Sequence, residues 1–111
     1  MKYPVQQLIN DNGNPAANQF VVRTKKAKYF QSYDSVVCKL DGINIVLSTD
    51  WEYSNTTRKH LYIFLRQNGY YNLSSAKEVR KAIKEGWVTL KKVSSLNVFF
   101  FIKFGGVEKN T

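Results

Sequence analysis

The chain has 111 residues, about the size of one domain, and 43% of them are hydrophobic, which excludes a wholly disordered protein. Lysine and arginine number 17 against 8 aspartates and glutamates, giving a formal net charge of +9. This excess favours an anionic partner, although many small basic proteins have none. We therefore expect one domain over residues 1–111 and look for the surface that carries its charge.

The cysteine count and the hydropathy of the chain indicate the compartment in which the protein is expected. The single cysteine, Cys38, cannot form an intramolecular disulfide, which is typical of a reducing compartment. The longest apolar run, residues 98–102, is far shorter than the ~18 residues that a membrane span needs. One histidine and one cysteine are too few for a zinc site. The expectation is a cytoplasmic protein without membrane contact, metal or cofactor.

The first half of the chain predicts strands. After an apolar start at residues 3–9, the sequence NDNGNPAAN predicts a loop or mobile arm over residues 10–19. A strand is predicted to open at residues 20–22, and four cations follow within residues 23–28. The runs SVVCKL and INIVLS flank the dipeptide Asp-Gly at residues 41–42, which predicts a hairpin with a type I′ turn.

Two helices are predicted in the middle of the chain. Ser54 or Asn55 can cap a helix that begins near residue 56 and ends at Gly69, since their side-chain oxygens accept from free backbone N–H groups. Ser75 followed by Glu78 is a capping-box pattern and predicts the start of a second helix, which ends at Gly86.

Two further strands are predicted at residues 87–93 and 97–104, followed by a flexible tail over residues 105–111. The order of strands, two helices and strands predicts a small single α+β domain. In it an antiparallel sheet of about five strands carries two consecutive helices on one face. A winged helix is the weaker alternative, because the linker at residues 68–74 is longer than a helix-turn-helix turn.

Catalytic patterns are weak. Asp50 and Glu52 form the one close pair of carboxylates, and an exposed pair beside Trp51 is more typical of a solvated rim than of an acid–base dyad. Cys38 and His60 lie on different predicted elements, which favours a core cysteine and a surface histidine over a nucleophile with its base. We therefore expect that the protein is not an enzyme.

The start of the first helix is the strongest candidate for a binding site. It combines free backbone N–H groups and the positive end of the helix dipole with hydroxyls and two cations, and so predicts an anion site. Cations there oppose the dipole, and such conflicts are typical of functional sites. The alternative is that Ser54 only caps the helix and the cations face water. The predicted phosphate contacts are Ser54, Thr56, Thr57, Arg58 and Lys59, with base stacking by Trp51 or Tyr53.

The second helix has a basic face that adds phosphate contacts at Arg80, Lys81 and Lys84. With residues 23–28 this gives three basic segments, which form one patch if the fold brings them together. The leading hypothesis is non-catalytic binding of DNA or RNA through a basic, aromatic-flanked surface. The rival is an accessory factor that inhibits a host defence or transcription machine, with aromatic side chains as anchors.

The block at residues 32–65 resembles a pattern in small phage- and plasmid-encoded proteins of unknown function. A Ser-Tyr pair precedes a hairpin, and an aromatic residue, Tyr-Ser, Thr-Thr and a basic-His pair follow it. The resemblance implies a viral accessory protein in a bacterial cytoplasm and no particular activity. The matching residues are Ser32, Tyr33, Trp51, Tyr53, Ser54, Thr56, Thr57, Lys59 and His60.

Overall fold

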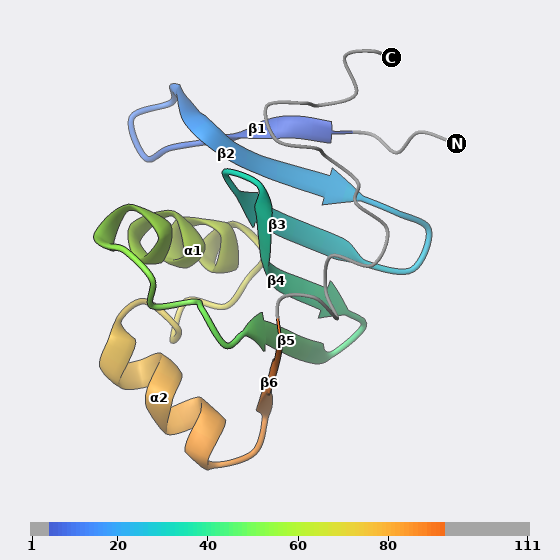
Figure 1. The fold of residues 1–111 in the computed structure, drawn as a ribbon, viewed down its shortest axis with the longest axis vertical. Coiled ribbons are helices and arrows are strands. Elements are labelled where there is room, and N and C mark those ends of the chain that lie inside the picture. The colour runs from blue at the N-terminus through green and yellow to red at the C-terminus, as the bar shows by residue number, and fades with distance from the viewer. Residues whose placement is uncertain (1–4, 93–111) are drawn as a thin grey trace.

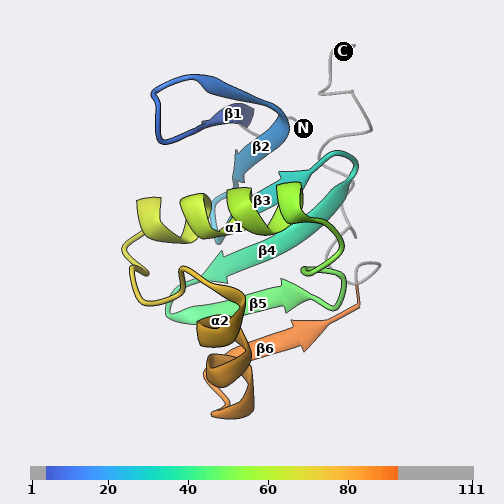
Figure 2. The same cartoon turned by 90° about the vertical axis from the view of Figure 1, so that its left-hand side faces the viewer.

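The computed structural model describes residues 5–92, which form a six-stranded sheet with two helices on one side (Figures 1 and 2). The strands follow chain order across the sheet. They are β1 (Val5–Ile9), β2 (Pro15–Arg23), β3 (Lys28–Ser32), β4 (Ser35–Asp41), β5 (Asn44–Ser48) and β6 (Val88–Lys91), and the helices are α1 (Asn55–Gln67) and α2 (Ala76–Lys84). The α+β class and the two helices on one face are confirmed. The predicted strand at residues 97–104 and the tail at 105–111 lie outside the described residues.

The sheet is mixed, with six strands where an antiparallel sheet of about five was predicted. Strands β1 to β5 pair antiparallel, whereas β5 and β6 are parallel, with Ser48 opposite Lys91. Both helices lie between these two strands in sequence, and such a crossover returns the chain in the same direction. The ends of β5 and β6, the β3–β4 turn and the start of α1 therefore lie at the same end of the sheet (Figure 2).

Residues 15–19 belong to β2, so the predicted loop over residues 10–19 was too long. Pro15 pairs with Ile9, which confines the turn of this first hairpin to residues 10–14. The carboxamide oxygen of Asn10 accepts from backbone N–H groups two and four residues later, at 2.9 and 3.0 Å. The turn residues were located correctly, but pairing with β1 extends the strand into a polar sequence that has weak strand propensity.

The predicted hairpin between β4 and β5 is present with its turn one residue later. Asp41 pairs with Asn44, so the loop residues are Gly42 and Ile43 rather than Asp41 and Gly42. Of these two, only Gly42 has a positive φ, 64°. A positive φ at the first loop residue alone is the pattern of a type II′ turn, not of the predicted type I′ turn.

Both helices begin at the predicted caps. The hydroxyl of Ser54 accepts from the backbone N–H of Thr57 at 3.1 Å, and Ser75 accepts from that of Glu78 at 3.3 Å. The Glu78 carboxylate in turn accepts from the backbone N–H of Ser74 at 3.1 Å. Each helix is followed by a glycine in the left-handed region, with φ of 92° and 91°.

The main core lies between the sheet and the helices. Phe30 of β3 and Phe64 of α1 are fully buried and stack with ring centroids 5.5 Å apart. Cys38 lies in the same core, and burial raises the pKa of its thiol. Val21 and Val22 are both buried although successive strand residues face opposite sides, so the sheet is apolar on both faces. Neither described helix is long and apolar enough to cross a membrane.

Replacing Phe64 by alanine is expected to lower the free energy of unfolding by about 3–5 kcal/mol, because it removes the aromatic contact with Phe30 in the core. Urea unfolding followed by fluorescence measures the change, since Trp51 lies in the same core. Tyr71→Ala is the matched control, because Tyr71 is 70% exposed. A similar loss of stability in both variants would contradict this description of the core.

Glu78 is expected to make the start of α2 sensitive to acid. Hydrogen bonds from the backbone and side chain of Ser74 lower the pKa of its carboxyl below the ordinary 4.5. Because the lowered pKa belongs to the folded state, the stabilisation is complete above pH 4.5 and disappears as the pH falls through the native value. Thermal unfolding across the acid range should therefore show a steeper loss of stability for wild type than for Glu78→Gln. Parallel pH profiles would show that the carboxylate contributes nothing.

Candidate binding cleft and basic helix surface

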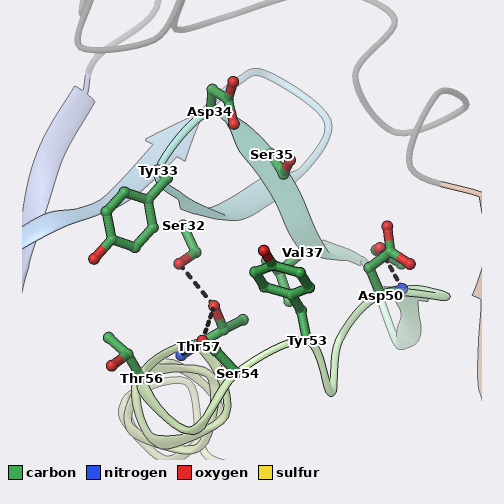
Figure 3. A pocket seen from close by; sticks show the side chains of 11 residues that line it. Ser32, Tyr33, Asp34, Ser35, Val37, Asp50, Tyr53, Ser54, Thr56 and Thr57 are labelled. Carbon is green, nitrogen blue, oxygen red and sulfur yellow. Dashed lines mark hydrogen bonds between the residues drawn. The ribbon is translucent and has the colours of Figure 1, made fainter.

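A cleft of about 610 Å³ opens where α1 begins (Figure 3). It lies between the β3–β4 turn, the end of β5 and the segment that leads into α1. Its volume is within the range of about 300–1,000 Å³ found for small-molecule sites. Six hydroxyl side chains line it, namely Ser32, Ser35, Ser48, Ser54, Thr56 and Thr57. Val37, two tyrosines and two aspartates complete the lining.

A chain of hydroxyls joins the sheet to the helix at the floor of this cleft. Ser32 at the end of β3 shares a hydrogen bond of 3.1 Å with the hydroxyl of Thr57, which also accepts from the Ser54 hydroxyl at 3.2 Å. Ser32 and Thr57 are both 4% exposed. Thr57 was predicted to bind phosphate, and this was wrong because its hydroxyl is buried and already bonded within the protein.

The two aromatic candidates lie in different environments. Trp51 is 3% exposed and belongs to the core, so the prediction that it stacks on a base was wrong. Tyr53 is 85% exposed at the cleft. Stacking by Tyr53 therefore stays a prediction.

Tyr33 is a feature of the cleft that sequence reasoning did not assign to a site. It lies in the β3–β4 turn with a φ of 57°, and its backbone N–H donates to the carbonyl oxygen of Asn18 at 2.7 Å. The Gln31 side chain donates to the Tyr33 carbonyl oxygen at 2.8 Å. Figure 3 shows Tyr33 and Tyr53 on opposite sides of the hydrogen bond between Ser32 and Thr57. The Ser-Tyr pair of the resemblance was the signal that could have found it.

The charges in the cleft are negative. Asp34 and Asp50 line it, whereas no lysine or arginine does so among residues 5–92. The backbone N–H of Asp50 donates to the Ser48 hydroxyl at 2.9 Å, which fixes the end of β5. Two carboxylates oppose a phosphate at this end of α1. The hydroxyls and the cations that were predicted to form one anion site therefore lie on different surfaces.

The cations of α1 lie outside the cleft. Arg58 and Lys59 border a shallower hollow with Tyr62 and Arg66. The Arg58 guanidinium donates to the backbone carbonyl oxygen of Glu52 at 2.9 Å and to the side chain of Asn55. These bonds orient the cation beside the helix start rather than over its free N–H groups.

Arg58 and the cations of α2 meet at Glu52. Arg80 forms an ion pair of 2.5 Å with the Glu52 carboxylate, and this bond raises the pKa of the Arg80 guanidinium. The pKa of Tyr62 between them is raised mainly by burial, and the two arginines oppose that shift. Lys81 and Lys84 are exposed farther along α2. The fold therefore brings one predicted contact of each helix, Arg58 and Arg80, to the same residue.

The third basic segment lies elsewhere, so the condition for one patch formed by all three segments is not met. Lys28 donates to the side chain of Asn68 at 2.6 Å, at the opposite end of α1 from Glu52. The 13 residues of α1 are about 20 Å long at 1.5 Å per residue. Residues 23–28 therefore form a separate basic surface.

The Cys38 and His60 side chains are not arranged as a nucleophile and its base. Cys38 is buried in the core, while His60 is partly exposed on α1 and its Nδ1 contacts the Thr56 carbonyl oxygen at 2.8 Å. Within the described part of the chain, no three His, Cys, Asp or Glu side chains form a group that could hold a metal ion.

These features define a small α+β domain with a mixed sheet, a hydroxyl-lined cleft and a basic helix surface. The chain belongs to a family of unknown function (DUF8033), whose model matches residues 3–86. The match includes both walls of the cleft and both helices. No curated protein and no solved structure matches the chain.

Replacing Ser54 by alanine is expected to cost about 1 kcal/mol of unfolding free energy, because it removes the helix cap and one bond of the hydroxyl chain. Thr56→Ala is the matched control, since Thr56 is exposed and should change stability by less than about 0.5 kcal/mol. Urea unfolding of both variants gives the comparison. A smaller loss of stability for Ser54→Ala than for Thr56→Ala would show that the Ser54 hydroxyl does not stabilise the start of α1.

Proposed function

We propose that this protein binds nucleic acid without catalysis, through a basic surface on the outer sides of α1 and α2. The observation that carries the proposal is the meeting of Arg58 and Arg80 around Glu52, which joins the cations of the two helices. The basic surface consists of Arg58, Lys59, Arg80, Lys81 and Lys84.

The composition of this surface suits phosphate. The first turn of α1 contains no acidic residue, and its exposed Lys59 has no ion pair within residues 5–92. Lys81 and Lys84 likewise have no ion pair among the described residues. Lysine side chains bind phosphates as mobile point charges, and Arg58, whose guanidinium is held by bonds to uncharged groups, supplies fixed positive charge beside them. Arg80 is ion-paired with Glu52. Affinity from such contacts depends steeply on salt.

We infer a phage- or plasmid-type accessory protein in a bacterial cytoplasm. The resemblance of residues 32–65 supports this inference, and a buried, unpaired Cys38 is typical of a reducing compartment.

A protein partner is the second candidate, because large aromatic side chains are exposed around α2. Tyr71 precedes this helix and Trp87 follows it, and both are exposed. Aromatic residues of this kind concentrate binding energy in protein interfaces. A host protein that stays bound to the tagged chain after nuclease treatment, and is released by Trp87→Ala, would favour an inhibitor of host machinery over nucleic-acid binding.

Two pairs of lysines provide a matched test of the basic surface. Lys81→Ala with Lys84→Ala should weaken binding to a random-sequence duplex and lower the slope of log affinity against log salt by about 0.9 for each phosphate that the two lysines neutralise. Lys25→Ala with Lys26→Ala removes the same charge from the separate surface and should leave most affinity intact. Fluorescence anisotropy at several salt concentrations measures both. Equal effects of the two pairs would show that net charge alone governs binding, and absence of binding at low salt would overturn the proposal.

A further inference from the structure

We propose that the cleft at the start of α1 holds one unpaired nucleobase that carries an exocyclic amino group, and that the phosphates stay outside it. The inference rests on the proposed nucleic-acid binding and names the part of the nucleic acid that is recognised. Cytosine, adenine and guanine have such an amino group, whereas thymine and uracil lack it.

Two exposed tyrosines form the aromatic walls of the cleft. Tyr33 and Tyr53 lie on opposite sides of the Ser32–Thr57 hydrogen bond, and both rings are exposed (Figure 3). A flat base entering between them finds a ring on either side and hydroxyls beneath. Stacking of this kind stabilises single-stranded nucleic acid with little dependence on base identity.

The backbone of Tyr33 is strained. Its φ of 57° lies in the left-handed region, which a bulky side chain rarely occupies. Elsewhere in the described chain a positive φ belongs to four glycines and to Asn18, residue types that tolerate it. The turn therefore has a tyrosine where glycine would be less strained. Its backbone N–H donates to Asn18 of β2 and its carbonyl oxygen accepts from the Gln31 side chain of β3, and these two bonds hold it there. A tyrosine in a strained backbone conformation, with its ring exposed, points to a contact of that ring with a ligand.

The polarity of the cleft indicates which base it accepts. The carboxylates of Asp34 and Asp50 form no ion pair or side-chain hydrogen bond within residues 5–92, so their oxygens are free to accept. Carboxylates accept from the amino group of cytosine in protein–DNA complexes. The same charges repel a phosphate, which excludes the nucleic-acid backbone from the cleft.

The basic surface lies close enough to hold that backbone. Thr56 lines the cleft, and Lys59 lies three residues later on the same helix, where side chains are neighbours. A strand with its base in the cleft can therefore place the adjoining phosphates against Lys59 and Arg58. A paired base cannot enter, so the geometry selects single-stranded or unpaired segments.

The test compares labelled single-stranded dC and dT oligomers of equal length. Wild type should bind the dC oligomer about tenfold more tightly, because the dT oligomer offers no amino group to the carboxylates. Asp34→Asn with Asp50→Asn should reduce this preference to less than about twofold while retaining duplex binding. Equal binding of the two oligomers by wild type, or an unchanged preference in the double variant, would overturn the inference.

A second pair of variants tests the aromatic wall. Tyr33→Asn keeps a residue that tolerates the left-handed backbone, and it should lower dC affinity without lowering the thermal unfolding midpoint. Tyr71→Ala removes an exposed tyrosine away from the cleft and should leave dC affinity unchanged. Equal dC affinity of Tyr33→Asn and wild type would also overturn the inference.

Free nucleosides separate failure of this inference from failure of the proposed function. Cytidine should shift the backbone amide NMR signals of residues 32–35 and 53–57, and uridine should not. If no oligomer binds but cytidine produces these shifts, the cleft site stands and the proposed nucleic-acid function fails. If neither oligomers nor cytidine bind, both fail.

Discussion

The buried hydrogen bond between Ser32 and Thr57 fixes the relation of the sheet to the first helix. A buried hydroxyl without a partner would cost about 1–3 kcal/mol, so the end of β3 and the first turn of α1 must stay in register with each other. The Ser54 hydroxyl extends this constraint to the helix cap. The cleft then follows, because Tyr33 lies directly after Ser32 and Tyr53 directly before Ser54. Ser54 and Thr57, whose hydroxyls were predicted as ligand contacts, thus position the walls of the cleft.

The first turn of α1 separates two surfaces of opposite charge. Thr56 borders a cleft with two carboxylates, whereas Arg58 and Lys59 border a separate hollow. This separation resolves the conflict between the cations and the helix dipole, since Arg58 is bonded to a carbonyl oxygen and a side chain rather than placed over the free N–H groups.

Local signals in the sequence predicted much of this fold. The caps at Ser54 and Ser75 and the β4–β5 hairpin were found because a helix start or a tight turn imposes demands on a few adjacent residues. The parallel β5–β6 pair was missed, since strand direction depends on the whole crossover. Side-chain direction was missed for the same reason: Trp51 and Thr57 lie within the predicted site segment, but tertiary packing turns both of them into the protein. Tyr33 could not be placed because its strained backbone depends on Asn18, a residue of another strand.

The parallel pairing of β6 has a consequence for the order of folding. Strands β1 to β5 form a meander in which each strand meets its neighbour through a short turn, so little loop entropy opposes their association. Of the described strands, only β6 is separated from its partner β5 by both helices in sequence, so we expect this pair to form after the helices. The backbone N–H of Thr49, which donates to the Lys91 carbonyl oxygen at 2.9 Å, closes this crossover beside the cleft. Among residues 5–92, the cleft therefore lies between the antiparallel strands, which pair through short turns, and the parallel pair that both helices separate in sequence. Local opening of β6 would loosen one edge of the cleft while strands β1 to β5 stay folded.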